Sequence, residues 1–281
     1  MTLSQAILPV AGLGTRFLPW TKVVPKELLP IGNQPIVALL VDECLSVGIT
    51  DICFVINRGK EAIPQYFYET PALEAELARK GKSHLLEELA RYHSVNFHVV
   101  YQETMLGDGH ALLQARDWVK SPEVAVLFGD DLIVGKKNGL QQLSDAMTKV
   151  SRERDTVMLC LQKIDPKHTE KYGIVAVEKD DKSAIKKVTR LVEKPSPKDA
   201  PSDLAIVGKY IVPKMVFDRL HEIEEGSHGS TSLTTGSGEI RLIDALIQLK
   251  DHLDIFGCAF EGKRYDTGTP EGYREAVIDL A

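Results

Sequence analysis

Residues 6–19 read AILPVAGLGTRFLP, and this stretch decides the fold that the sequence predicts. Its first half is apolar and of strand length, which indicates a buried strand. The second half turns abruptly into a glycine-rich loop that contains Gly12, Gly14 and Arg16. A buried strand that runs into such a loop is typical of parallel α/β sheets, in which ligands bind beyond the carboxyl ends of the strands. We therefore expect a ligand at this loop.

Strand-length apolar runs alternate with helical patterns along the next part of the chain. Strands are expected at residues 51–57, 96–102 and 124–128, and helices at 36–47, 61–67 and 111–119. This alternation predicts an α/β protein of Rossmann-like type, with a mixed, mostly parallel central sheet flanked by helices. From residue 156 onward β-branched strands predominate, at 156–162, 173–177, 187–194 and 205–212. These indicate a more antiparallel second half.

Other segments complete the expected organisation. Thr70 and Pro71 predict a helix start, and the leucine-rich stretch to Arg91 predicts a helical insertion on the surface, interrupted at Gly81. A hairpin turn is expected at residues 179–182, a flexible loop at 226–238, helices at 214–223, 239–249 and after Pro270, and a strand at 253–260. Because no linker or repeat divides the chain, we expect residues 1–281 to form a single domain.

Composition excludes several classes of function. The 281 residues carry a net charge of −6, which argues against a nucleic-acid partner or an anionic membrane surface. The N-terminus lacks the pattern of a signal peptide, and we expect no membrane-spanning segment. The four cysteines are far apart and form no CxxC pair, which is typical of reduced core residues in the cytoplasm.

A local cluster of positive charge stands out in this acidic chain. Arg16, Lys22 and Lys26 follow Gly12 and Gly14 within one loop, so backbone N–H groups and cations could together hold phosphates. The loop lacks the third glycine of a dinucleotide fingerprint, and no GxxxxGK[ST] motif occurs. A phosphate site and a purely structural turn both remain open from these residues alone.

Two further loops carry polar groups that suit a nucleotide. Asp130 and Asp131 follow the strand at 124–128, and adjacent carboxylates at a strand end are suitable ligands for Mg²⁺, although Gly-Asp is also common in plain turns. Gln102 ends the strand at 96–102, and Gly107 lies in the loop that follows it. A glutamine amide both donates and accepts, which suits the imide edge of uracil or thymine.

LPVAGLGTR at residues 8–16, followed by PKELLP at 25–30, resembles the signature of the nucleoside-triphosphate sugar-1-phosphate transferases. The resemblance implies the nucleotide-diphospho-sugar transferase fold and a single nucleotidyltransferase domain. It also implies that Arg16 and Lys26 are catalytic and hold the triphosphate and its departing pyrophosphate. Ala11, Gly12 and Gly14 would belong to the substrate-binding loop.

The same resemblance extends along the chain in the order of the family motifs. RYDTGTP at residues 264–270 implies that Asp266 joins Asp130 as a metal ligand. VEKP at 192–195 implies that Glu193 binds sugar hydroxyls and that catalytic Lys194 neutralises the sugar phosphate. The remaining implied substrate-binding residues are Gln102 and Gly107 at the base, and Gly173 and Val207 at the sugar.

The resemblance implies a reaction of UTP with α-D-glucose 1-phosphate that yields UDP-glucose and pyrophosphate. The expected mechanism is Mg²⁺-dependent in-line displacement at the α-phosphorus, and the expected assembly is a homodimer or homotetramer in the cytoplasm. Two alternatives remain open: the same chemistry on dTTP, and a catalytically idle regulatory paralogue. Loss of Arg16, Lys26, Asp130, Lys194 or Asp266 would mark the idle protein, and all five are present.

Overall fold

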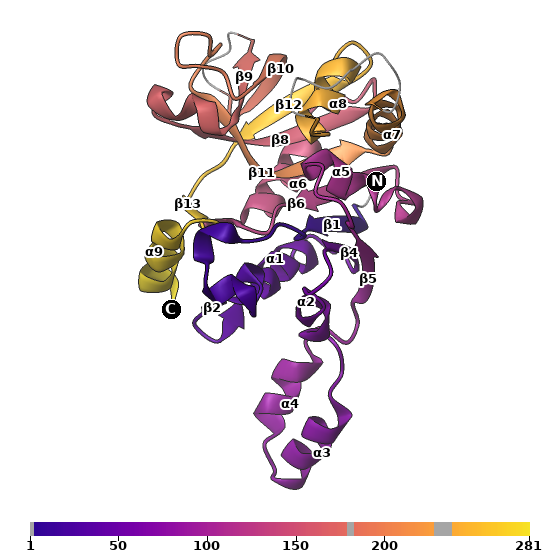
Figure 1. Ribbon diagram of the computed structural model, residues 1–281, viewed down its shortest axis with the longest axis vertical. Helices are drawn as coiled ribbons and strands as arrows, with labels where there is room; N and C mark the ends of the chain where they lie inside the picture. The colour runs from indigo at the N-terminus through magenta and orange to yellow at the C-terminus, as the bar shows by residue number, and fades with distance from the viewer. Residues whose placement is uncertain (1–2, 179–182, 228–237) are drawn as a thin grey trace.

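A computed structural model of the protein describes residues 3–178, 183–227 and 238–281 (Figure 1). The hairpin turn expected at 179–182 lies outside the described residues, as do residues 228–237 of the expected loop. Within the described ranges, no helix is long and apolar enough to cross a membrane.

One large sheet runs through the described chain. Its nine strands lie in the order β5-β4-β1-β6-β11-β8-β12-β10-β9 among the described residues. Their bounds are β1 Gln5–Pro9, β4 Asp51–Ile56, β5 Asn96–Tyr101, β6 Glu123–Leu127, β8 Thr156–Lys163, β9 Gly173–Val177, β10 Ile185–Glu193, β11 Leu204–Pro213 and β12 Asp254–Ala259. Strands β5, β4, β1 and β6 pair in parallel, whereas β11 is antiparallel to both β6 and β8. The expected mixed α/β sheet is confirmed, with four parallel strands from the first half of the chain and a further parallel pair, β8 and β12, in the second half.

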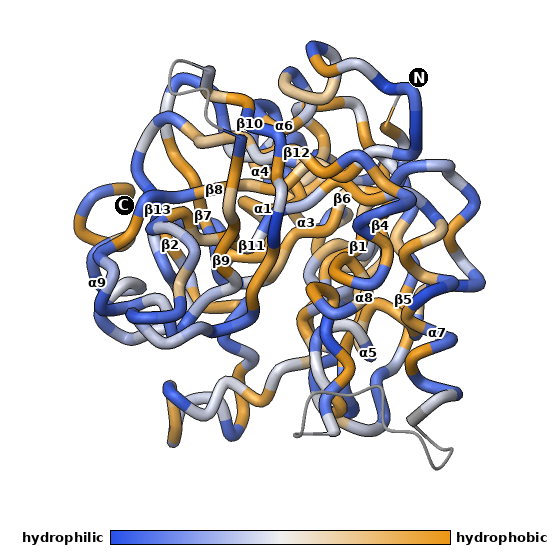
Figure 2. Tube along the Cα trace, turned by 90° about the horizontal axis from the view of Figure 1, so that it is seen from above, coloured by the Kyte–Doolittle hydropathy of each residue, from blue (hydrophilic) through white to orange (hydrophobic). Residues whose placement is uncertain are grey.

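Helices cover both faces of this sheet. They are α1 Ile36–Leu45, α2 Ala62–Gln65, α5 Asp108–Leu113, α6 Gly139–Met147, α7 Met215–Ser227, α8 Leu242–Leu249 and α9 Pro270–Leu280. One buried apolar cluster joins the sheet to α1, α2, α6 and α9, and another joins it to α5, α7 and α8. Figure 2 shows the hydrophobic residues concentrated along central strands such as β1, β6 and β8.

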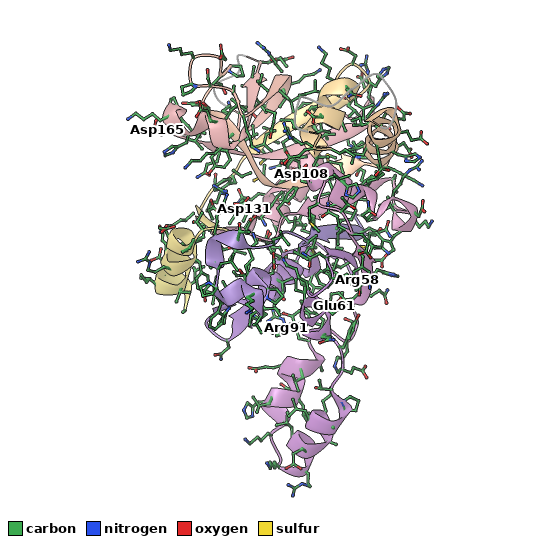
Figure 3. All side chains as sticks on the ribbon, in the orientation of Figure 1. Arg58, Glu61, Arg91, Asp108, Asp131 and Asp165 are labelled. Carbon is green, nitrogen blue, oxygen red and sulfur yellow. The ribbon has the colours of Figure 1, made fainter. Side chains whose placement is uncertain are left out.

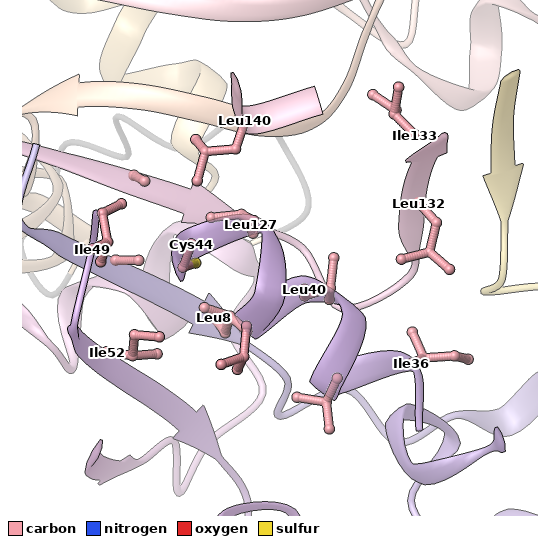
Figure 4. Close-up of a cluster of buried hydrophobic side chains, with 14 of the residues drawn as sticks. Leu8, Ile36, Leu40, Cys44, Ile49, Ile52, Leu127, Leu132, Ile133 and Leu140 are labelled. Atoms are coloured by element: carbon pink, nitrogen blue, oxygen red, sulfur yellow. The ribbon is translucent and has the colours of Figure 1, made fainter. Parts of the chain in front are cut away.

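The strands divide their side chains between these two clusters by simple alternation. In β1, Ala6 and Leu8 belong to the α1 side and Ile7 to the α5 side, as the period of two in a strand requires. Figure 4 shows the first cluster, where Leu8 and Leu127 of the sheet lie next to Leu40 of α1. Both faces of β1 are therefore buried, which explains its continuous apolar sequence.

The expected surface insertion forms a helical hairpin that projects from the body of the molecule (Figure 1). Its helices are α3 Pro71–Arg79 and α4 Ser83–Ala90, and neither contains a buried residue. Thr70 is the N-cap, Pro71 takes the first helical position, and Gly81 separates the helices with a φ of +66°. The prediction of this insertion, with its break, is confirmed.

Several short elements differ from the sequence-based expectation. The sequence predicted neither α6 nor the antiparallel pair of β7 Asp131–Val134 and β13 Lys263–Asp266. The helix expected at 239–249 begins only at Leu242, because Arg241 is extended and the backbone of Ile240 bonds to Leu106 and Gly109. The remaining short elements are β2 Pro30–Ile31, β3 Gln34–Pro35, η1 Thr15–Phe17, η2 Trp20–Lys22, η3 Lys26–Leu28, η4 Arg116–Trp118 and η5 Pro166–Lys171.

A fully buried ion pair connects three elements on the α1 face. Lys209 of β11 has no exposed surface, and its Nζ lies 2.9 Å from Oε1 of Glu43 in α1. The other carboxylate oxygen of Glu43 accepts from the backbone N–H of Leu140 at 3.1 Å, near the start of α6. Glu43 thus joins α1 to both β11 and α6.

Removing one partner of this pair should destabilise the protein strongly. We expect Lys209→Met to lower the free energy of unfolding by about 3–5 kcal/mol, since it leaves the Glu43 charge buried and uncompensated. The double variant Glu43→Gln/Lys209→Met removes both charges and keeps an acceptor for Leu140, so it should recover most of this loss. Urea denaturation of the three proteins measures the difference, and a double variant less stable than Lys209→Met would contradict the expectation.

Candidate active site

The loops that follow β1, β5 and β6 meet at one edge of the sheet and line a cavity of ≈440 Å³. From the loop after β1 come Ala11, Gly12, Gly14 and Lys26. Gln102 and Gly107 come from the loop after β5, and Asp130 follows β6. The structure thus brings seven of the predicted site residues to one cavity.

The glycine-rich loop is held in shape by its own residues. Gly14 has a φ of +64°, which favours glycine, and its carbonyl accepts from the Thr21 hydroxyl at 2.8 Å. Above Gly12 there is open space, since a Cβ there would meet no atom within 4 Å. Arg16 is exposed, and its Nη1 donates to the Gly268 carbonyl at 3.4 Å. The loop therefore leaves its backbone accessible at Gly12, and the Arg16 guanidinium lies at the end of the loop.

Lys26 and Asp130 form the central ion pair of the cavity, with 2.7 Å between Nζ and Oδ2. Burial alone would raise the pKa of Asp130, but Lys26, helped by Arg264 and Arg16, outweighs it and lowers this pKa below its usual value. Burial likewise opposes the charge of Lys26, yet Asp130 and Glu27 raise the Lys26 pKa. Both groups are thus charged at neutral pH.

A more deeply buried ion pair, Glu27 with Lys60, lies next to Lys26. Glu27 is 1% exposed, and its Oε2 lies 2.8 Å from Nζ of Lys60. The same Nζ donates to the Val10 carbonyl at 2.7 Å, which ties the end of β1 to the Lys26 segment. Sequence reasoning missed Lys60; its only signal was a position just beyond the carboxyl end of β4.

Asp266 reaches the same place through the small β7–β13 sheet. The antiparallel register places Asp266 opposite Asp131, and Thr267 donates to the Asp130 carbonyl from its backbone N–H (2.8 Å) and its hydroxyl (3.0 Å). A Cβ on Gly268 would lie 2.7 Å from Oδ2 of Asp130 and 3.1 Å from Oδ1 of Asp266. The two predicted metal ligands therefore converge on the space above Gly268.

This carboxylate pair fits a divalent cation of the Mg²⁺ type. Such an ion commonly takes one or two protein carboxylates and completes its shell with water and substrate phosphates. Across the described ranges, no group of three or more His, Cys, Asp and Glu side chains could hold a metal ion. A metal at Asp130 and Asp266 would thus depend on the substrate for its remaining ligands.

Asp131 has a different role from its neighbour Asp130. It forms an ion pair with Nε of Arg264 in β13, and both side chains are about one-tenth exposed. Burial opposes the charge of Arg264, but Asp131 outweighs burial and raises the Arg264 pKa. Nη1 of Arg264 also donates to Gln162 (3.2 Å) and to the Tyr172 hydroxyl (3.4 Å). Asp131 thus organises the wall of the site.

A smaller cavity of ≈210 Å³ adjoins the first, and Asp130 and Asp108 line both. Figure 3 shows Asp108 and Asp131 in the middle of the molecule, between α1 and the β8–β12 part of the sheet. The predicted sugar-side residues Gly173, Glu193 and Lys194 line this smaller cavity. The two groups of predicted residues therefore meet at Asp130.

The sugar-side segment has an unusual backbone. Lys194 has a φ of +45° and is the one non-glycine residue with positive φ in the described chain. Its N–H donates to the Tyr172 carbonyl at 3.1 Å, and its Nζ lies 3.4 Å from Oε1 of Glu193. Such conformations are costly and persist where the surroundings impose them, often at functional sites.

One of the four predicted sugar-side residues, Val207, does not line this cavity. Val207 is 1% exposed and belongs to the core on the α1 face, while its neighbours Ile206 and Gly208 line the smaller cavity. The reason is the alternation of side chains along β11, which turns residue 207 away from the faces of 206 and 208. The Val207 side chain therefore packs in the core, and that Val207 lines the sugar pocket through its backbone and small side chain stays a prediction.

The loop after β5 requires glycine at Gly107. Its φ is +109°, and a Cβ there would lie 2.5 Å from the Ile240 carbonyl oxygen. Asp108, which sequence reasoning did not select, accepts from the Leu242 N–H at 2.9 Å at the start of α8. The Gly-Asp-Gly sequence at 107–109 would have been the signal for this close backbone contact.

Fold and site together define a nucleotide-binding transferase centre, and comparison with known proteins agrees. The family model of the nucleotidyl transferases matches residues 5–281, so the chain belongs to this family. Members of the family generally use a divalent metal ion.

The chain is 36% identical over 278 residues to UTP–glucose-1-phosphate uridylyltransferase of Bacillus subtilis, covering 99% of this chain and 90% of that protein. Among solved structures, it resembles a UDP-glucose pyrophosphorylase complexed with UDP-glucose, with 30% identity, a TM-score of 0.81, and coverage of 99% and 98% of the two chains. A UTP-bound UGPase from Acinetobacter baumannii gives 30% identity and a TM-score of 0.85, with coverage of 99% and 93%.

The space above Gly268 can be tested by filling it. We expect Gly268→Ala to push the Asp130 and Asp266 carboxylates apart and to lower turnover about 100-fold, the order expected for a displacement near 1 Å. Ile278→Ala, at an exposed residue of the following helix, is the control and should have no effect. Steady-state kinetics across a metal titration measures the effect; normal turnover by folded Gly268→Ala would contradict it.

Proposed function

We propose that this enzyme is a UTP–glucose-1-phosphate uridylyltransferase, which converts UTP and α-D-glucose 1-phosphate to UDP-glucose and pyrophosphate. The observation that carries the proposal is the junction of the two cavities at Asp130. One cavity has the bare glycine loop and Lys26, which suit a triphosphate, and the other has Glu193 and Lys194, which suit a sugar phosphate. The names of the Bacillus relative and of the solved structures support the same substrates.

The proposed reaction is an in-line displacement. An oxygen of the sugar phosphate attacks the α-phosphorus of UTP, the new P–O bond forms, and the bond to the bridging oxygen of the β-phosphate breaks. Pyrophosphate leaves with that electron pair. No protein base is needed, because the sugar phosphate is already largely ionised near neutral pH.

The side chains act by positioning and charge. Arg16 and Lys26 bind the β- and γ-phosphates and neutralise the departing pyrophosphate, while Lys194 holds the phosphate of the sugar. Asp130 and Asp266 would hold Mg²⁺, which supplies charge neutralisation and alignment of the two reactants when bound. Glu193 accepts hydrogen bonds from sugar hydroxyls, and Gln102 and Gly107 contact the base.

The remaining features belong to the same proposal. We treat residues 1–281 as one nucleotidyltransferase domain that acts in the cytoplasm as a homodimer or homotetramer. The four cysteines are all buried and free, as expected for a reducing compartment. The net charge of −6 supports neither a nucleic-acid nor a membrane partner.

The direct test is pyrophosphate release from UTP and glucose 1-phosphate by the purified protein in the presence of Mg²⁺. We expect turnover that requires all three, with kcat/KM for UTP above that for dTTP in a side-by-side assay. A higher value with dTTP would replace the proposed nucleotide. A correctly folded protein without turnover on either would instead support the idle paralogue.

Asp130→Asn should lower kcat by about two to three orders of magnitude, as is typical when one electrostatic stabiliser of a transition state is lost. The loss should not be recovered at saturating UTP, because the carboxylate acts on the reacting centre. Asp199→Asn, at an exposed site, is the matched control. Near-normal kcat in Asp130→Asn would remove this residue from the mechanism.

Lys194→Met tests the assignment of the smaller cavity. We expect it to raise KM for glucose 1-phosphate and lower kcat, while the dissociation constant of UTP changes little. Lys198→Met, at an exposed lysine of the same segment, should behave like the wild type. If Lys194→Met lost affinity for UTP rather than for glucose 1-phosphate, Lys194 would bind the triphosphate and not the sugar phosphate.

A further inference from the structure

A hydrogen bond to the protein backbone fixes the orientation of the Gln102 side-chain amide. Gln102 is 4% exposed, and its Nε2 donates to the Gly107 carbonyl at 3.0 Å. A backbone carbonyl can only accept, so the nitrogen of the amide, and not its oxygen, faces Gly107. Gln102 lines the larger cavity, and among the described residues no hydrogen bond reaches its Oε1.

His110 engages the second hydrogen of the same amide. Its Nδ1 lies 3.1 Å from Nε2 of Gln102. The contact is a hydrogen bond in the tautomer that carries the ring proton on Nε2, because Nδ1 then accepts from the amide nitrogen. Oε1 of Glu224 in α7 lies 3.5 Å from Nε2 and favours a proton there. The Gln114 amide nitrogen lies 3.2 Å from the same Nε2, but it donates to the His110 carbonyl at 3.1 Å, so Nε2 need not accept from it.

The environment keeps this ring neutral. Burial lowers the pKa of His110 below its usual value, against the opposing effects of the Glu224 carboxylate and the Thr104 backbone. Glu103, Arg116, Asp117 and His221 line the polar cavity next to the ring. A neutral ring with a free Nδ1 lone pair is the form that can accept from Gln102.

We propose that His110 is a positioning residue that makes the nucleotide site select bases with an N3–H group. With both amide hydrogens engaged by Gly107 and His110, Gln102 offers the cavity only its Oε1 acceptor. Uracil and thymine present N3–H to such an acceptor, whereas cytosine presents a lone pair and is repelled. The inference rests on the proposed function, since it explains how the site would distinguish UTP from CTP.

The size of the effect follows from the burial of the amide. A site built to bond one substrate group rejects an analogue that lacks it, because the buried polar partner is left unpaired or opposed. We expect the wild-type protein to prefer UTP to CTP by on the order of 100-fold or more in affinity.

The test compares His110→Leu, which removes the acceptor, with His110→Asn, whose amide oxygen can replace Nδ1. Dissociation constants for UTP and CTP are measured by calorimetry with Mg²⁺ on the full-length protein, alongside kcat/KM for both nucleotides. We expect His110→Leu to lower the UTP/CTP ratio about tenfold or more, because Gln102 can then rotate. His110→Asn should restore most of the ratio, and His221→Leu, on the far side of Glu224, should keep it.

An unchanged UTP/CTP ratio in His110→Leu would overturn the proposal, whether the two affinities stay the same or fall by the same factor. Nitrogen NMR of the wild-type imidazole tests it without any substitution that could unfold the protein: a proton on Nδ1 would overturn it, and one on Nε2 supports it. A wild-type protein that binds neither nucleotide would overturn the proposed function itself. Normal UTP turnover with an unaltered ratio in His110→Leu would remove only the role of His110.

Discussion

The parallel pairing of β1 with β4 on one side and β6 on the other is the constraint on which the site depends. Parallel strands present their carboxyl ends at the same edge, so residues that follow positions 9, 56 and 127 come together although they are far apart in the chain. Lys60 and Val10 bond across this edge, and so do Lys26 and Asp130. Glycine loops and charged groups thus converge without any local sequence relation between them.

Strand β11 lies between the two parts of the site and runs opposite to the strand on either side of it. It runs antiparallel to β6, and beyond it lie the strands that carry the second cavity. Asp130 and Asp108 lie at the boundary and line both cavities. A transferase must hold two substrates so that their reacting atoms meet, and two cavities that adjoin at Asp130 provide such an arrangement.

The sequence predicted the strands of the parallel half and the helical insertion well, because long apolar runs and a Thr-Pro helix start are local signals. It could not predict how Asp266 reaches Asp130, since β7 and β13 have only four residues each and show no clear period. The family motif does not say which face of β11 a residue takes, so it could not predict that the Val207 side chain packs in the core. Lys60 and Glu27 escaped notice because a buried ion pair leaves no pattern in one sequence.

The ion pairs around Asp130 explain how so many charges can share one small space. Lys26, Arg264 and Lys60 each have a carboxylate partner within the described protein, so the site is assembled before substrate arrives. Two of these pairs, Glu27–Lys60 and Asp131–Arg264, are buried and set the backbone on either side of the third. Asp130 is 33% exposed at its side chain, and Lys26 is 15% exposed. The pair that faces the cavity is therefore the one that can exchange its partner for a phosphate or a cation, while the buried pairs keep the surrounding geometry fixed.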